Sequence, residues 1–141
     1  MRSVVTIALA LSLAACSDDV VIARYATLKD AENAGAVSRG WLPDWLPKSA
    51  VEIEEAHDVD TNISALQLTF SPSEDWRPPE ECGSVDLPSI PKAKGLDDWP
   101  DDVPPRWSTP RHSFMQCEDG KAFLAFSMQS GEMFYWRTNG V

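Results

Sequence analysis

The stretch VEIEEAHDVDTNISALQLTF, residues 51–70, has the pattern of a β-hairpin and decides the fold class. Val51 and Ile53 alternate with glutamates, and Leu66 and Leu68 lie on one face of a second alternating run. Between the two runs lies DVDTN, a five-residue segment rich in turn formers. The sequence therefore predicts two antiparallel strands joined by a five-residue loop.

A second sheet signal lies near the C-terminus, where residues 112–138 predict a three-stranded meander. Turns are indicated at Asp119-Gly120 and at Ser130-Gly131. The strand between them, KAFLAFSMQ, carries apolar side chains on both of its faces. We expect one face of this sheet to meet a helix and the other to meet a loop.

The segment TLKDAENAGAV, residues 27–37, predicts one helix at the N-terminal side of the hairpin. Thr27 suits the N-cap, and Asp30 stands where the acid of a capping box belongs. Gly35 weakens the prediction for the last turn.

Residues 71–111 contain nine of the eleven prolines and three of the six tryptophans. This proline density excludes long helices and central strands. A disordered linker would not usually carry so many tryptophans, so we expect a long irregular loop laid over the body of the protein. Together these elements predict an α+β fold over residues 27–141, with an antiparallel sheet of about five strands, one N-terminal helix and this Pro/Trp-rich loop.

The first residues, MRSVVTIALALSLAAC, have the charged, apolar and small-residue regions of a secretory signal. Their end, Leu13-Ala14-Ala15-Cys16, looks like a bacterial lipobox. That resemblance implies cleavage after residues 1–15 and lipid, including palmitate, on Cys16. The alternative is an ordinary signal peptide cut elsewhere, which would leave Cys16 as a plain thiol.

Residues 16–26 are then expected to form a short lipidated tether that holds the folded body close to the membrane. Ser17 directly after the lipid site resembles an outer-membrane sorting signal, although Asp18 follows it. We therefore expect a lipoprotein on the periplasmic face of the outer membrane.

The remaining cysteines, Cys82 and Cys117, fit an exported protein. An oxidising compartment allows the two thiols to form a disulfide bond. A metal pair or a reactive thiol are alternatives, although neither cysteine lies in a CxxC motif.

The formal net charge of −10 argues against nucleic acid and against adsorption on anionic lipid. The expected membrane partner is therefore reached through the lipid on Cys16. The acidity also suits a basic partner or cations, but surface solvation explains it equally well.

Part of the chain resembles a family of small exported bacterial proteins of unknown function. The residues that carry the resemblance are Arg24, Tyr25, Gly40 to Pro43, Leu46, Pro47 and His57 to Asn62. They cover about a third of the mature chain. The resemblance implies no activity.

Metal chemistry has one candidate group in the sequence. His57, Asp58 and Asp60 lie in the hairpin, and His112 could approach them through sheet pairing. The alternative is a hairpin loop whose carboxylates bond their own backbone. A catalytic zinc needs three protein ligands, and the chain has only two histidines. Neither a G-x-S-x-G motif nor a phosphate-binding glycine motif occurs, so we expect no catalysis and no cofactor.

The tryptophans suggest a binding role instead. Trp76, Trp99 and Trp107 of the Pro/Trp-rich loop could stack on cell-wall glycan or contact a basic protein. The doubled Trp-Leu-Pro of GWLPDWLP, residues 40–47, is expected to fill the core and clamp the helix onto the sheet. We therefore expect a lipid-anchored, non-catalytic protein with a structural or binding role. The alternatives are a binding module for peptidoglycan or a basic periplasmic protein, and a metal-dependent hydrolase.

Overall fold

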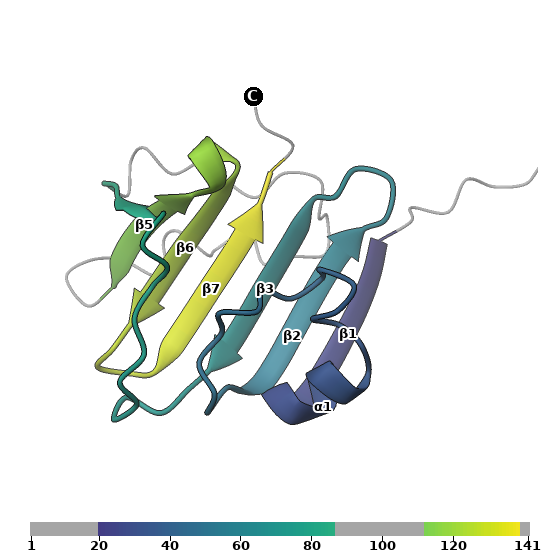
Figure 1. Ribbon diagram of the computed structural model, residues 1–141, viewed down its shortest axis with the longest axis horizontal. Coiled ribbons are helices and arrows are strands. Elements are labelled where there is room, and N and C mark those ends of the chain that lie inside the picture. The colour runs from purple at the N-terminus through teal and green to yellow at the C-terminus, as the bar shows by residue number, and fades with distance from the viewer. Residues whose placement is uncertain (1–19, 87–111, 139–141) are drawn as a thin grey trace, which may run out of the picture.

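The strands form a single antiparallel sheet in a computed structural model that describes residues 20–86 and 112–138 (Figure 1). The sheet has seven strands in the order β1-β2-β3-β7-β6-β5-β4. Their bounds are β1 Val20–Thr27, β2 Val51–Asp58, β3 Ser64–Thr69, β4 Gly83–Ser84, β5 Ser113–Cys117, β6 Ala122–Ser127 and β7 Glu132–Arg137.

The predicted α+β class is wrong, because the described fold is almost entirely sheet. Its helical content is the six-residue α1 (Leu28–Asn33) and the three-residue 3-10 turn η2 (Glu118–Gly120). The capping box of Thr27 and Asp30 is present at the start of α1. The helix ends early because Gly35 has a φ of +78°, a left-handed conformation that stops the helix. None of the helices in the described ranges is long and apolar enough to cross a membrane.

The strand count was too low because two strands were not recognised. The hairpin and the meander correspond to β2–β3 and to β5–β6–β7, and β3 pairs with β7 to join them. The missed strands are the two ends of the sheet. β4 has only two residues, too few for a periodic signal, and the VVIARYAT sequence of β1 lacks regular alternation.

Residues 20–26 of the predicted tether, 16–26, belong to a strand of the sheet. Val20–Thr27 pairs with β2, from Val20 opposite Asp58 to Thr27 opposite Val51. The folded domain thus begins at Val20 at the latest, and not at Thr27.

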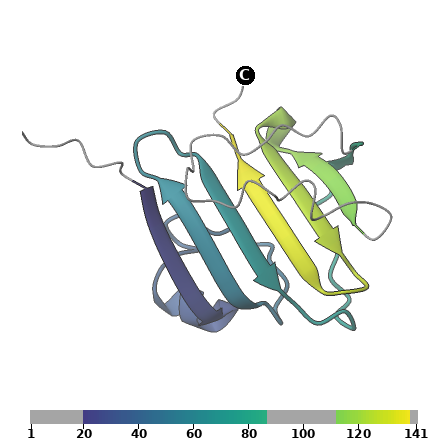
Figure 2. The ribbon, with the colours of Figure 1, turned by 180° about the vertical axis from the view of Figure 1, so that it is seen from behind.

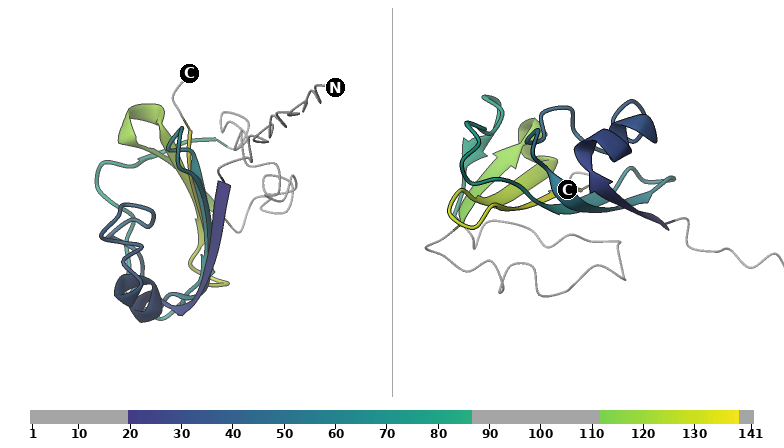
Figure 3. Two further views of the ribbon diagram at one scale, coloured as in Figure 1. Left: turned by 90° about the vertical axis from the view of Figure 1, so that its right-hand side faces the viewer. Right: turned by 90° about the horizontal axis from the view of Figure 1, so that it is seen from below.

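One face of the sheet is covered by α1, by the chain that follows it and by the segment leading into β4, as Figure 3 shows. Leu42 and Leu46 of GWLPDWLP are buried there, while Trp41 and Trp45 are partly buried and packed against the same cluster. The stretch does act as a core plug, but its leucines lie deeper than its tryptophans.

The opposite face of the sheet, seen in Figure 2, carries a second apolar cluster. Its aromatic members include Phe123 and Trp136, whose rings stack with centroids 5.6 Å apart. Phe134 lies beside Trp136 in the same cluster. Residues 87–111, most of the Pro/Trp-rich loop, lie outside the described residues.

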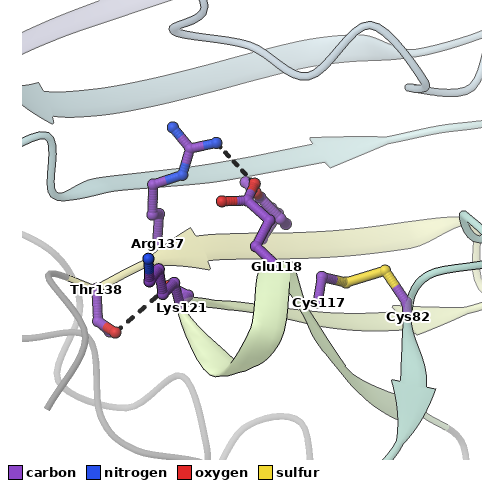
Figure 4. A network of polar contacts seen from close by, with 7 residues as sticks. Cys82, Cys117, Glu118, Lys121, Arg137 and Thr138 are labelled. Carbon is purple, nitrogen blue, oxygen red and sulfur yellow. Dashed lines mark hydrogen bonds and ion pairs between the residues drawn. A yellow bond between two sulfur atoms is a disulfide. The ribbon is translucent and has the colours of Figure 1, made fainter.

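Cys82 and Cys117 form a disulfide, the pair indicated by the cysteine count. The bond joins the residue before β4 to the last residue of β5, so it fastens the edge of the sheet (Figure 4). Cys16, the predicted lipid site, lies outside the described residues.

Candidate functional site

A pocket of about 320 Å³ lies where β2 ends, β3 begins and β7 ends. We call it the Trp41 pocket. The lining residues that matter for its chemistry are Arg39, Trp41, His57, Asp58, Ser64 and Arg137.

The sheet register places three polar residues of this pocket in one row. Ser64 of β3 is opposite His57 of β2 on one side and opposite Arg137 of β7 on the other. Directly opposite residues of an antiparallel sheet project from the same face, and adjacent strands are ~4.8 Å apart. Figure 1 shows the three strands side by side. The floor of the pocket is therefore a continuous polar row of an imidazole, a hydroxyl and a guanidinium.

A buried carboxylate holds the imidazole. His57 Nδ1 lies 2.9 Å from Glu55 Oε2, and the two residues are only 4% and 1% exposed. Burial raises the pKa of Glu55, while the bond to His57 and the charge of Arg39 act in the opposite direction. His57 Nε2 and Glu55 Oε1 are buried and have no hydrogen-bond partner.

Two protonation states of the pair with zero net charge present an N–H at His57 Nε2. A charged pair has Glu55 ionised and both ring nitrogens protonated. A neutral pair has the proton on Glu55, which donates it to Nδ1, and then Nε2 carries the ring proton. Both arrangements contain the same number of protons and leave the Nε2–H without an acceptor.

Trp41 lies over this pair. Its ring is stacked on His57 with centroids 4.2 Å apart, and the Arg39 guanidinium carbon is 3.9 Å from the indole centroid. Two groups this close to one ring cannot share a face, so the indole is sandwiched between them. Arg39 Nη2 also donates to the carbonyl of Ala34, and the cation–π contact adds to the positioning of the indole.

Arg137 is held from its outer side by Glu118, as Figure 4 shows. Its Nη2 donates to Glu118 Oε1 at 2.7 Å, and the Tyr135 hydroxyl donates to the same oxygen. Burial, followed by the bond to Glu118, raises the pKa of Tyr135 above its ordinary 10. The Nε of Arg137 is buried and has no hydrogen-bond partner.

The predicted metal candidates do not come together. Asp58 Oδ1 accepts from the backbone N–H groups of Asp60 and Thr61, which is the hairpin-loop alternative. Hydrogen bonds from Thr61 and then Asp60 lower the pKa of Asp58. His112 precedes β5, at the opposite end of the sheet from His57, and its Nε2 lies 3.7 Å from Glu132. Within residues 20–86 and 112–138, no group of three or more His, Cys, Asp or Glu side chains could hold a metal ion.

Trp76, a predicted binding residue, is a core side chain. It is 9% exposed, lies edge-to-face on Phe126 and donates its Nε1–H to the carbonyl of Trp45. This burial removes Trp76 from the candidate binding surface. Trp99 and Trp107 lie outside the described residues.

Sequence reasoning missed Arg39, Glu55, Ser64 and Arg137, and it assigned Trp41 to the core alone. One signal was available: Glu55 and His57 follow Ile53 at the period of a strand, which places both on the buried face. A glutamate on that face requires a partner, and His57 is the nearest one.

Comparisons with curated proteins and with solved structures gave no match. A family model does match just over a third of the chain, and the matched part contains β1, α1, β2 and β3. The matched part also includes every lining residue named above except Arg137. Residues 19–69 are thus similar to the family described as the YbbD head domain, which supports the resemblance to a small bacterial family carried by residues 24–62.

Proposed function

We propose that this protein is a lipid-anchored, non-catalytic binding protein of the cell envelope and that the Trp41 pocket is its ligand site. One observation carries the proposal: residues of two separate segments line one pocket in which the buried His57 Nε2 has no partner. The first segment supplies Gly40 and Trp41, and the second supplies His57, Asp58, Val59 and Asn62. These segments are also the ones that carry the family resemblance. Native buried polar groups without partners are uncommon, and an absent ligand is one explanation for them.

The envelope location rests on the N-terminal sequence and on the cysteines. LAAC at residues 13–16 suits lipid attachment, and Ser17 suits the outer membrane. A disulfide between Cys82 and Cys117 is compatible with an oxidising compartment.

Peptidoglycan is the favoured ligand over a basic protein. The pocket contains two arginines, Arg39 and Arg137, although the chain as a whole is acidic. Positive charge in the site favours a ligand with an anionic part. A metal-dependent hydrolase is less well supported, because His112 is at the far end of the sheet and the described residues contain no group of three or more His, Cys, Asp or Glu side chains that could hold a metal ion.

The binding role is tested by sedimentation of a soluble form, beginning at Ser17, with insoluble peptidoglycan. We expect the wild-type protein to enter the pellet and Trp41→Ala to remain in solution. Trp45→Ala is the matched control, because Trp45 belongs to the same repeat and packs on the core but does not line the pocket. Wild-type protein that stays in solution would argue against peptidoglycan.

The anchor is tested separately by labelling cells with radioactive palmitate. The wild-type chain should incorporate label and Cys16→Ala should not. Equal labelling of the two chains would contradict the lipid anchor.

A further inference from the structure

Two buried nitrogen atoms without hydrogen-bond partners line the same pocket. They are Arg137 Nε, which is a donor, and His57 Nε2, which is a donor in the tautomer whose Nδ1 accepts a proton from Glu55 and in the doubly protonated ring. Leaving a buried donor without an acceptor is unfavourable, and more so where the group is charged. A ligand that carries a hydrogen-bond acceptor would satisfy both of these atoms.

Both donors flank one residue, Ser64, which is opposite each of them in the sheet. Strand spacing places the backbones of His57 and Arg137 ~10 Å apart, with Ser64 midway between them. An acceptor group above Ser64 is therefore within side-chain reach of both donors. The Ser64 hydroxyl supplies a third polar contact.

The charges around this position favour an anion. Arg39 and Arg137 are cationic, and Arg137 is paired with Glu118 on its outer side, which leaves its Nε without a partner. The one carboxylate lining the pocket, Asp58, already accepts from two backbone N–H groups of its own loop. Tyr25 completes the titratable groups near Glu55, and burial raises the pKa of its hydroxyl, which keeps it neutral.

The shape of the donor set favours a planar group. A carboxylate has two oxygens about 2.2 Å apart in one plane, and arginine N–H groups match that geometry. A single carboxylate can place one oxygen toward Arg137 Nε and the other toward His57 Nε2. A tetrahedral dianion would place an additional charge near Asp58.

We propose that the row His57–Ser64–Arg137 is a carboxylate-binding site. The inference rests on the proposed function and narrows it: within peptidoglycan, the part recognised is the free carboxylate of a peptide stem and not the glycan. The indole of Trp41, which is stacked on His57, then borders the bound group and limits its contact with water.

The test uses the soluble chain from Ser17 and small probes followed by ¹H–¹⁵N NMR. The probes are N-acetyl-D-alanyl-D-alanine, the same dipeptide with a C-terminal amide, and inorganic phosphate. We expect the acid to shift the Trp41 indole signal in a saturable way, and the amide and phosphate to leave it unchanged. Equal shifts from acid and amide, or stronger binding of phosphate, would overturn the proposal.

Variants identify the residues involved. His57→Gln and Ser64→Ala should each weaken binding of the acid, with a loss of about tenfold or more for His57→Gln because a hydrogen bond to a charged group is removed. Ser64→Ala guards against a folding failure of the buried His57 variant. Arg24→Gln is the matched control, because Arg24 pairs with Glu54 and lies outside the pocket. Unchanged affinity in both His57→Gln and Ser64→Ala would overturn the proposal.

The two proposals fail separately. Sedimentation with peptidoglycan but no binding of the acid removes the carboxylate site alone, whereas binding of the acid without sedimentation removes peptidoglycan as the ligand.

Discussion

Trp41 and Trp76 occupy different environments although both lie on the same face of the sheet. Trp76 is 9% exposed and has ring contacts with Trp45, Phe70 and Phe126. Trp41 is only partly buried, and its ring lies between His57 and Arg39. The first environment is that of a core residue, and the second is that of a residue covering a site.

These environments predict different costs of truncation. Trp76→Ala should lower the free energy of unfolding by about 3–5 kcal/mol, because it leaves a cavity in the core. Trp41→Ala should cost about 2 kcal/mol, since part of its surface is already in water and the stacking contacts contribute about 1 kcal/mol. Urea denaturation monitored by circular dichroism measures both values. A larger loss for Trp41 than for Trp76 would contradict this distinction.

The contacts of Glu118 predict that it stabilises the protein at neutral pH and not in acid. Burial raises its pKa, but hydrogen bonds from Arg137 and Tyr135 outweigh burial and hold the pKa below the ordinary 4.5. A carboxyl with a lowered folded pKa stabilises the protein above its unfolded pKa, and the effect is lost as the pH falls through the folded pKa. Glu118→Gln should therefore be less stable than wild type at pH 7, and the difference should shrink below about pH 4.5.

The measurement is a series of urea unfolding curves from pH 3 to pH 7. Glu80→Gln is the control, because Glu80 is exposed and precedes the sheet edge without taking part in the Glu118 network. A difference between Glu118→Gln and wild type that stays constant over this pH range would contradict the assignment.

At the scale of elements, the disulfide compensates for a very short strand. β4 contributes only the pairs Gly83 with Gln116 and Ser84 with Met115. The bond between Cys82 and Cys117, 35 residues apart in sequence, closes the chain around this edge. In the chain-entropy model a loop of this length is worth about 3–4 kcal/mol.

Replacing both cysteines by serine should therefore lower the free energy of unfolding by about 3–4 kcal/mol. The loss of amide protection should begin at β4 and β5, because this edge has the fewest other contacts. Denaturant unfolding combined with hydrogen exchange tests both statements. If amide protection is lost first in β2 and β3, the edge formed by β4 and β5 would not be the least stable part of the sheet.

Element prediction succeeded where a local pattern was sufficient. The turn residues Asp119-Gly120 and Gly131 located the meander, and the five-residue loop located the hairpin. Pairing between distant segments was not predictable in this way. Nothing local to Val20–Thr27 distinguishes an extended tether from an edge strand, because the distinction depends on the available edge of β2.

The same limit applies to the site. His57 could be selected from the sequence because histidine is rare in this chain. Its relation to Arg137 could not, because 80 residues separate them and the register of β3 and β7 brings them into one row. Trp41 was visible as part of a repeated motif, but its position over an imidazole depends on where the chain after α1 returns across the sheet.

At the scale of the whole molecule, the pocket and the expected anchor are at the same end of the sheet. Val21 of β1 is opposite His57, so the row that forms the pocket floor extends to the first described strand. Cys16 is four residues before Val20, a span of at most ~14 Å. A chain anchored at Cys16 would therefore hold this end of the domain, including the Trp41 pocket, close to the membrane surface.

Truncation tests whether β1 belongs to the folded domain. Chains beginning at Ser17, Val20 and Leu28 would be compared by urea unfolding. We expect the first two to have the same free energy of unfolding, because residues 17–19 precede the first paired residue. The third should be substantially less stable, because β1 pairs with β2 along its whole length and supplies the Thr27 cap of α1. Removing it also exposes the edge of β2, so this chain should associate at high concentration.

Loss of the cap alone is the matched control for the shortest chain. Thr27→Ala in the chain from Ser17 should cost about 1 kcal/mol, because it removes the side-chain bond to the Asp30 N–H but keeps every strand pair. If the free energy of unfolding of the chain from Leu28 falls no further than that of Thr27→Ala, residues 20–26 would act only as a tether. A much larger loss would confirm β1 as part of the structural domain, and then only residues 17–19 would separate the expected anchor at Cys16 from the sheet.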